Sequence, residues 1–459
     1  MTSIILLSVF GIINLFLGFL KSNKIMLPVV IFFLAVVFGV NFLDWNDPQS
    51  HFSNMLTIDN FAVAFSAIMV LTLVMILPFS RSYITDGNPH LAEFYSILMF
   101  SLVGAIMMVS YENIIMLFLG IEILSIAMYV MAGSEKKRLR SNEAALKYLL
   151  MGSFATGILL FGFALIYGAS GSFNITDIAV FSAKTDAPDL MPMMEIGVLL
   201  VLVGICFKIG AAPFHFWTPD VYEGTPTLFT AYMSTVVKTA GIAAFYKLVW
   251  AVFPGLNDFW YPTLVAITVL TLVIGNIGAA IQTSFKRMMA YSSIAHAGYL
   301  LIALTSFNDY SQNAIFFYAL SYTVATVAAF GVLKLVADQR EGEGYEIFNG
   351  LGRTNPLLAF SMTVAMCSLA SIPLTGGFFA KFFIFGSAID AGAIWLVVVA
   401  ILMSAVSSYY YFRVVMAMYM KEPAGERVAV DGFASFMLIA LSIFTFIMGI
   451  FPGWFNNWL

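Results

Sequence analysis

The chain has 459 residues, of which 61% are hydrophobic and only 10% are charged. An ordinary soluble domain carries about 25% charged residues, so this composition excludes a soluble enzyme. The net charge of −4 without a basic patch excludes a nucleic-acid binder. The chain has two cysteines, and they form no CxxC or zinc spacing. This excludes a disulfide scaffold and a redox centre in this chain.

Runs of about 20 mostly apolar residues predict membrane-spanning helices. About fourteen such runs follow one another, so we expect an all-α polytopic membrane protein with a single membrane domain over residues 1–459. The first run has no preceding basic residue and no small-residue cleavage site, so it is not expected to be a signal peptide. The runs lie near residues 3–20, 25–43, 58–79, 92–110, 112–132, 143–168, 194–212, 227–250, 262–282, 289–306, 312–337, 356–388, 391–420 and 432–451.

The basic residues of the loops predict the orientation of the helices, because lysine and arginine gather on the cytoplasmic side. With the loops numbered in chain order, only Lys184 falls in an even-numbered loop. We therefore expect the odd-numbered loops in the cytoplasm and, with an even number of spans, both termini outside the cytoplasm. The odd-numbered loops hold Lys21, Lys24, Arg81, Lys136, Lys137, Arg138, Arg140, Lys286, Arg287, Arg340, Arg353, Lys421 and Arg427.

Four ionisable residues lie deep within the apolar runs, where a charged side chain costs about 3 kcal/mol or more. They are Glu122, Lys208, Lys238 and Lys381. Such residues normally face the interior of a helix bundle and mark the path of ions or protons. A purely structural ion pair is the alternative for each of them, and we favour the functional interpretation.

Four further basic residues in the runs have simpler explanations. Lys147 follows Glu143 by four residues, the spacing of an ordinary helix pair, so a structural and a functional role both stay open. Lys247 and Lys334 lie near helix ends, where we expect them to reach out to the membrane interface. The role of Arg413 is not assigned, and a structural one is favoured.

His296 lies in the middle of the run SSIAHAGYL. Histidine gains and loses a proton near neutral pH, so this residue is a candidate for a proton step between the lysines. An ordinary core histidine is the alternative interpretation.

Two of the predicted helices are expected to be broken. The run FKIGAAPFHFW places Lys208 five residues before Pro213, and IPLTGGFFAKFF places Lys381 eight residues after Pro373. Proline removes a backbone donor and clashes with the preceding turn. Broken helices occur inside membranes where they line a cavity, and a lysine beside both breaks favours such a function over ordinary kinks.

The order of the helices also predicts an internal repeat. The fourth to eighth runs, about residues 92–250, and the ninth to thirteenth, about residues 262–420, are blocks of five helices of similar length. An odd number of helices in each block forces the two blocks into opposite orientations, which is the geometry of inverted repeats.

The run FKIGAAPFHFWTPDVYEGTPT, residues 207–227, resembles the signature of the antiporter-like membrane subunits of respiratory complex I. The runs FLGIEILSIAMYVMAG, FKRMMAYSSIAHAGYL and IPLTGGFFAKFFIF support the resemblance. Within this family WTPDVYEG is similar to the N-type subunits, whereas L-type, M-type and Mrp antiporter proteins tend to read WLPDAH. M-type subunits carry a glutamate in the place of Lys381, and the chain lacks the long lateral helix of the L type.

This resemblance implies a subunit of a proton-translocating NADH:quinone oxidoreductase, in which quinone reduction elsewhere drives proton movement. The chain would bind no cofactor itself, while other subunits would use NADH, FMN, iron–sulfur clusters and quinone. Its partners would be the K-type and M-type membrane-arm subunits, the lipid bilayer and protons. The residues that match the family's proton path are, in chain order, Glu122, Lys147, Lys208, Lys238, His296 and Lys381.

The resemblance also implies a mechanism. Burial disfavours the charged form of a lysine and a nearby carboxylate favours it. Moving Glu122 away from Lys208 would therefore release a proton toward Lys238, and from there to His296 and Lys381.

Three alternatives stay open. The chain could be a subunit of an Mrp-type cation/proton antiporter without redox coupling, which sodium-dependent transport would favour. It could be a structural membrane-arm subunit that pumps nothing, which harmless substitutions of the buried lysines would favour. It could also be the equivalent subunit of a photosynthetic complex, since those proteins share TPDVYEG.

Overall fold

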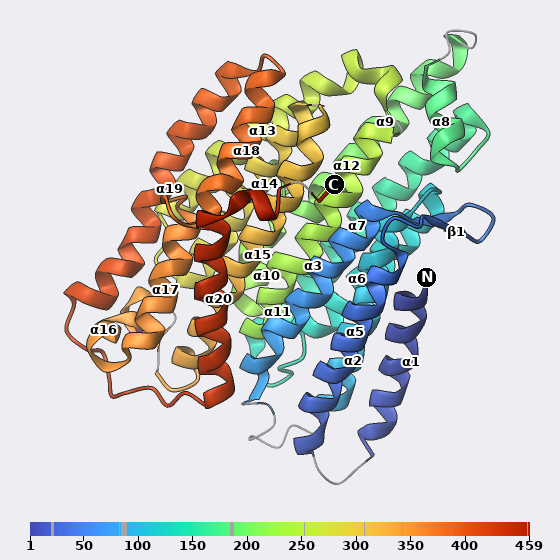
Figure 1. Cartoon of the computed structure of the whole chain (residues 1–459). Coiled ribbons are helices and arrows are strands. Elements are labelled where there is room, and N and C mark those ends of the chain that lie inside the picture. The colour runs from blue at the N-terminus through green and yellow to red at the C-terminus, as the bar shows by residue number, and fades with distance from the viewer. Residues whose placement is uncertain are drawn as a thin grey trace. The chain divides into compact units, whose positions relative to one another are not determined.

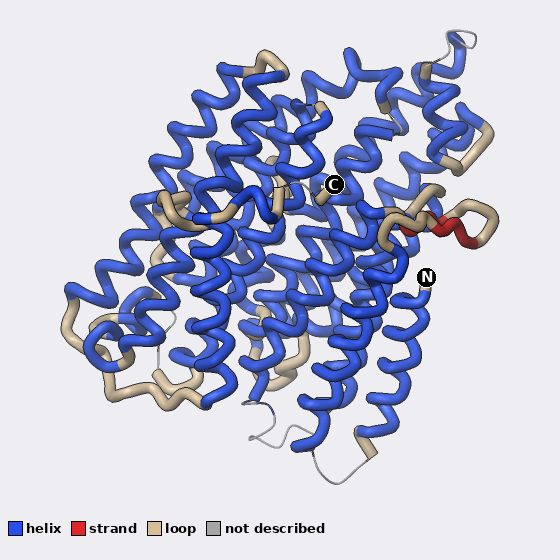
Figure 2. Tube along the Cα trace, viewed as in Figure 1, coloured by secondary structure: helices blue, strands red, loops and turns tan. Residues whose placement is uncertain are grey.

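The computed structural model of the chain describes residues 1–19, 23–81, 83, 90–183, 188–251, 253–306, 308–340, 342, 344–456 and 458–459. Within these ranges the chain is almost entirely helical (Figure 1, Figure 2). Twelve of the described helices are long and apolar enough to cross a membrane. The predicted all-α polytopic membrane protein is therefore confirmed. Two loop residues that entered the predicted orientation, Lys21 and Lys184, lie outside the described residues.

The helices agree with the apolar runs, with small shifts of their ends. In the first half of the chain they are α1 (Thr2–Leu17), α2 (Met26–Asn41), α3 (Asn60–Ile76), α5 (Leu91–Ser110), α6 (Ile114–Ala132), α7 (Leu139–Ser170), α8 (Ile175–Ser182), α9 (Met191–Ile209), α10 (Trp217–Gly224) and α11 (Thr227–Tyr232). In the second half they are α12 (Lys238–Ala251), α13 (Asn257–Ala280), α14 (Phe285–Ser306), α15 (Asp309–Ala337), α16 (Leu351–Thr354), α17 (Pro356–Leu369), α18 (Gly376–Asp390), α19 (Ile394–Met420) and α20 (Gly432–Ile450).

Two of the expected runs form shorter elements than a full span. The first is the 16-residue helix α1. The run expected at 356–388 consists of α17 and α18, which are separated by a break where Pro373 was expected to cause one. The run at 391–420, which is also long, is the unbroken helix α19.

A short hairpin was not predicted from the sequence. Strands β1 (Gln49–His51) and β2 (Leu56–Ile58) pair antiparallel, with Gln49 opposite Ile58. Three-residue strands are too short to show an alternating pattern in the sequence.

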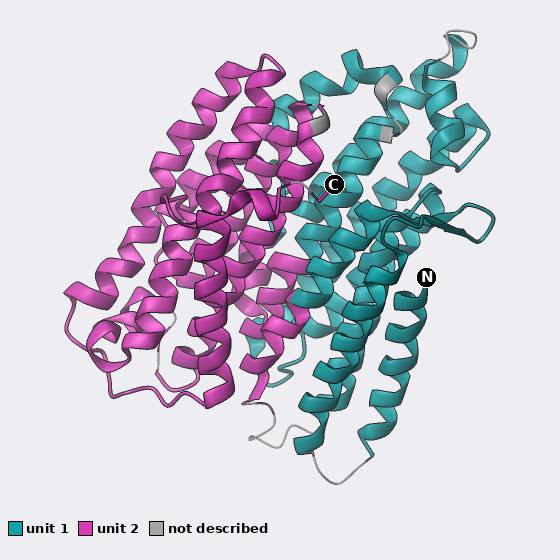
Figure 3. Ribbon diagram, in the orientation of Figure 1, with its two compact units in different colours: residues 1–71, 87–217, 237–267 teal, residues 72–86, 218–236, 268–459 magenta. Residues whose placement is uncertain are grey.

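The described chain divides into two compact units, which are coloured separately in Figure 3. Unit 1 comprises residues 1–71, 87–217 and 237–267, and unit 2 comprises residues 72–86, 218–236 and 268–459. The units are defined by contacts and not by repeated structure, so the inverted repeats at about 92–250 and 262–420 stay a prediction.

Small residues bring the helices of unit 1 close together. A side chain added at Gly104 of α5 would lie 2.7 Å from the carbonyl oxygen of Gly120 in α6. One added at Gly162 of α7 would lie 2.8 Å from the carbonyl oxygen of Gly197 in α9. Lipid provides no hydrophobic force between helices, so membrane helices associate by such close packing. This close packing fixes the position of α6 against α5 and of α9 against α7. Helix α6 carries Glu122, and helix α9 carries Lys208.

Helix α15 is the centre of unit 2. It is buried along its length and packs against α14, α17, α18 and α20. Helix α19 packs against α14, α17 and α18. The two halves of the broken helix, α17 and α18, are therefore enclosed by continuous helices, which is the environment that a break inside a membrane needs.

Candidate functional site

The first broken helix ends beside Lys208, in unit 1. Gly210 adopts the left-handed conformation (φ 73°) that ends α9, and the N–H groups of Gly210 and Ala211 donate to the last carbonyls of the helix. The indole of Trp217 donates a third hydrogen bond, 3.0 Å long, to the carbonyl of Phe207. Two of the carbonyl groups at the end of α9, those of Cys206 and Phe207, thus have hydrogen-bond partners beyond the helix, which stabilises the predicted break.

Lys208 is buried and is bonded to a neutral hydroxyl group. Its Nζ donates to Ser125 Oγ of α6 at 2.7 Å, and Ser125 in turn donates to the carbonyl of Ile121. Glu122 lies one turn before Ser125 on the same helix, and its charge acts on Lys208. Within the described residues Lys208 makes no ion pair, and one buried oxygen of Glu122 has no hydrogen-bond partner. The carboxylate is near the lysine without being bonded to it.

Lys238 is buried at the contact between α12 and α9. It is the first residue of α12 and follows directly on a π-helical turn, Met233–Val237. A side chain added at Gly241, one turn further on, would lie 3.9 Å from Cγ of Lys208. Residues three apart share a helix face, so Lys238 faces the same end of α9. We call Glu122, Ser125, Lys208 and Lys238 the first lysine site.

Lys147 lies near the beginning of α7 and is half-buried. Its ammonium group pairs with Glu143 at 2.8 Å, as the spacing of four residues predicts. The next residue, Tyr148, stacks on the ring of Trp217 with 4.7 Å between ring centres. The helix turn that carries Lys147 therefore packs on the first break.

At the second break, in unit 2, the backbone of α18 lies very close to the end of α17. Between α17 and α18 the chain passes through Ser371 and Leu374, both with positive φ. The N–H of Gly377 donates to Ser368 Oγ at 3.1 Å. A side chain at Gly377 would lie only 1.8 Å from the carbonyl oxygen of Ser368, so this position accepts glycine alone.

Lys381, one turn into α18, repeats the arrangement of Lys208. Its Nζ donates to Ser404 Oγ of α19 at 2.8 Å and lies 4.2 Å from the centre of the Tyr299 ring. A lysine over an aromatic face gains a favourable cation–π interaction. Within the described residues it makes no ion pair. The ammonium group of Lys381 is therefore stabilised by the Ser404 hydroxyl and the Tyr299 ring, and by no directly paired carboxylate among the described residues.

His296 is one turn before Tyr299 on α14, and it is also buried. Its Nδ1 lies 2.6 Å from the hydroxyl of Tyr318, and its Nε2 lies 3.1 Å from the hydroxyl of Tyr411. Residues three apart share a helix face, so α14 presents His296 to the tyrosines and Tyr299 to Lys381. We call His296, Tyr299, Lys381 and Ser404 the second lysine site.

The remaining charges of the apolar helices have different partners. Lys247 donates to Glu112 at 2.6 Å, and Lys334 bonds to Asp338 one turn further on. Their side chains are only 10% and 9% exposed and meet carboxylates that are 24% and 35% exposed, so the expectation that these two lysines reach out to the membrane interface stays a prediction. Arg413 donates to two backbone carbonyls at the end of α13 and just beyond it, each at 3.2 Å.

The sequence did not single out the hydroxyl partners of these sites. Ser125 follows Glu122 by three residues, a spacing that would have placed it on the same helix face. No such signal exists for Ser404, Tyr318 and Tyr411, because each belongs to another helix than the residue it contacts.

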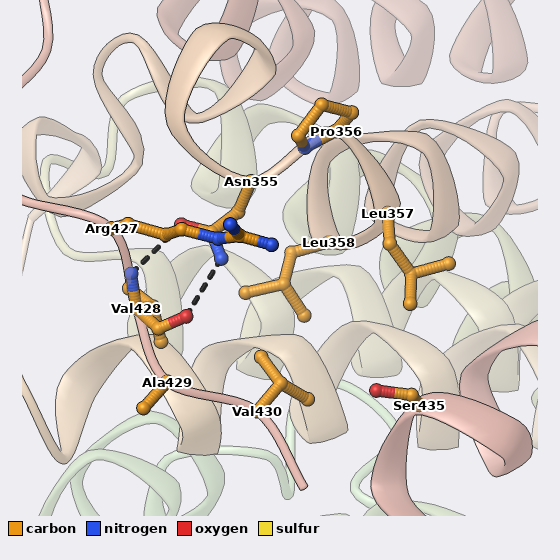
Figure 4. A pocket seen from close by; sticks show the side chains of 9 residues that line it. All are labelled: Asn355, Pro356, Leu357, Leu358, Arg427, Val428, Ala429, Val430 and Ser435. Carbon is orange, nitrogen blue, oxygen red and sulfur yellow. Dashed lines mark hydrogen bonds between the residues drawn. The ribbon is translucent and has the colours of Figure 1, made fainter. Parts of the chain in front are cut away.

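A surface pocket of about 480 Å³ lies away from both sites, beside the start of α17 (Figure 4). Asn355 exchanges two hydrogen bonds with Val428 there, and Arg427 is the one titratable residue that lines it. No residue of the lysine sites contributes to this pocket. The described residues contain no group of three or more potential metal ligands.

The sequence matches the family model described as NADH:quinone oxidoreductase/Mrp antiporter over residues 112–407. It is 41% identical to NADH-quinone oxidoreductase subunit N of Cytophaga hutchinsonii, with 98% of each chain covered. It is 39% identical to the protein of the same name from Flavobacterium johnsoniae, with 99% of this chain and 98% of the relative covered.

Among solved structures, the fold is similar to a chain of respiratory complex I from Thermus thermophilus with bound aureothin. The TM-score is 0.84 and the sequence identity 32%, over 98% of this chain and 97% of that chain. The likeness thus extends over both units.

Proposed function

Because this chain belongs to the NADH:quinone oxidoreductase/Mrp antiporter family, we propose that it is a proton-translocating subunit of the membrane arm of an NADH:quinone oxidoreductase. Quinone reduction in other subunits drives the protons through the buried residues of this chain. NADH, FMN, iron–sulfur clusters and quinone belong to those other subunits, and the neighbours in the membrane are of the K and M types.

The observation that carries this proposal is the difference between two classes of buried lysine. Lys247 and Lys334 face carboxylates, and a nearby carboxylate favours the charged form of a lysine. Lys208 and Lys381 instead donate to serine hydroxyls. A hydroxyl accepts a hydrogen bond from an ammonium group and donates one to a neutral amine. A lysine on a hydroxyl can therefore lose and regain a proton without losing its hydrogen bond.

In the proposed cycle Glu122 sets the charge of Lys208. While the carboxylate is near, the ammonium form is favoured, and when it moves away the proton passes to Lys238 on the neighbouring helix. His296 and Lys381 then receive protons in the second lysine site. Lys147, paired with Glu143, contributes a positive charge beside the first break.

The proposal is tested by proton uptake into inverted membrane vesicles that contain the assembled complex. NADH oxidation should drive uptake in sodium-free buffer, and Lys208→Gln combined with Lys381→Gln should lower the number of protons moved per quinone reduced. An Mrp-type antiporter subunit, the alternative within the same family, would instead need sodium. A structural subunit would pump normally in the double variant.

The proposed location is the bacterial inner membrane, with both termini in the periplasm. Ser134→Cys, in the loop with four basic residues, should react with a membrane-impermeant maleimide only from the cytoplasmic side. Ser50→Cys, at the exposed β1 strand, should react only from the periplasmic side. The unsubstituted chain is the control, because Cys206 is buried and Cys367 half-buried. Labelling of both positions from one side would refute this orientation.

A further inference from the structure

Both ring nitrogens of His296 are covered by tyrosine hydroxyls. Tyr318 of α15 covers Nδ1 at 2.6 Å, and Tyr411 of α19 covers Nε2 at 3.1 Å. The ring of Tyr322 packs against the imidazole with 4.7 Å between ring centres. A proton can therefore reach or leave each ring nitrogen of His296 through a phenol group.

The two tyrosines differ in what lies on their far side. The hydroxyl of Tyr411 also hydrogen-bonds to Ser292, one turn before His296 on α14, and to its neighbour Tyr410. Tyr318 instead lines a small cavity of about one water molecule in size, which His296 and Ser321 also line. Ser368 and Gly377, on the two sides of the second break, line the same cavity.

One arrangement of these hydroxyl hydrogens selects a single tautomer of the histidine. If the hydroxyl hydrogen of Tyr411 is donated to Ser292, the Tyr411 oxygen is free to accept the hydrogen of Nε2. A neutral imidazole carries one N–H, so Nδ1 is then the bare nitrogen and accepts from Tyr318. The 2.6 Å contact at Nδ1 fits an O–H group that donates to it.

We propose that Tyr411 and Ser292 hold His296 with its hydrogen on Nε2, and that Tyr318 is the group through which Nδ1 exchanges protons with water in the cavity at the second helix break. In the loading step the hydroxyl proton of Tyr318 moves to Nδ1, while a protonated cavity water gives a proton to the Tyr318 oxygen. The charged imidazole then donates through both nitrogens, to Tyr318 and to Tyr411. The reverse transfers unload it, so no proton is gained or lost overall.

This inference rests on the proposed function of His296, and it assigns different roles to the two tyrosines. Tyr318 carries the proton, whereas Tyr411 is a positioning residue that acts through the histidine. Ser292 should matter only as the acceptor that keeps the Tyr411 hydroxyl turned away from Nε2.

The test uses the assembled complex in inverted vesicles. Tyr318→Phe should lower proton uptake per quinone reduced at least tenfold for the step through His296, and Tyr411→Phe about threefold to tenfold, the equivalent of one hydrogen bond. Ser292→Ala should reproduce the Tyr411→Phe defect, and the two together should be no worse than either alone. The solvent deuterium isotope effect on coupled turnover should increase in Tyr318→Phe.

Tyr111→Phe is the matched control, because Tyr111 is equally buried and its hydroxyl donates to the backbone carbonyl of Ala244, which is no part of the second lysine site. It should pump as the wild type does. Additive defects of Tyr411→Phe and Ser292→Ala, or an unchanged isotope effect in Tyr318→Phe, would overturn this inference alone. Normal pumping by an assembled His296→Gln complex would overturn the role of His296 itself, and with it the proposed path.

Discussion

Lys381→Arg should leave the complex assembled and remove at least nine-tenths of its proton uptake, a loss of about tenfold that corresponds to about 1.4 kcal/mol. Arginine keeps the positive charge, can donate to Ser404 and can stack on the ring of Tyr299. It does not release its proton at any workable pH. If Lys381 serves only packing, its function is retained in the arginine variant. If Lys381 must release and regain a proton, its function is lost.

Lys334→Arg is the matched control for this experiment. Lys334 is also buried on a helix of unit 2, but its ammonium group pairs with the carboxylate of Asp338. Its arginine variant should therefore pump normally. The measurement is proton uptake per quinone reduced, normalised to the complex seen on a native gel. Equal uptake in the two variants would remove Lys381 from the proton path.

The sequence predicted the breaks in the helices because proline and glycine act locally. Pro213 and Pro373 lie four residues beyond the last residues of α9 and α17, where the ring clashes with a continuing helix, and Gly210 permits the left-handed turn that ends α9. The positive φ angles of Ser371 and Leu374 could not be predicted, because neither residue type favours that conformation. They are imposed by the packing of α17 and α18.

The depth of the lysines in the apolar runs was predictable, but their partners were not. Lys208 and Ser125 are 83 residues apart, and Lys247 and Glu112 are 135 residues apart. Only the packing of the helices determines whether a buried lysine meets a carboxylate or a hydroxyl. For this reason the sequence could not separate Lys247, which is in an ion pair, from Lys208, which is not.

Glu122→Gln should lower proton uptake severalfold while the complex still assembles. The substitution keeps the shape of the side chain and removes the charge that acts on Lys208. At an effective dielectric of about 20, opposite charges roughly 5 to 8 Å apart attract by about 2 to 3 kcal/mol. Losing this attraction disfavours the charged form of Lys208, so the lysine is loaded less often in each cycle. Its hydrogen bond to Ser125 remains, which protects assembly.

Glu112→Gln distinguishes this effect from the general cost of removing a buried carboxylate. Glu112 bonds directly to Lys247 at 2.6 Å, so its loss leaves a buried ammonium group without its partner, at a cost of about 3 to 5 kcal/mol. That variant should assemble poorly, while the complexes that do form should pump normally. Glu122→Gln should show the opposite pattern, with good assembly and poor pumping. The same assembly defect in both variants, with normal proton uptake per assembled complex, would mean that Glu122 serves packing and has no part in loading Lys208.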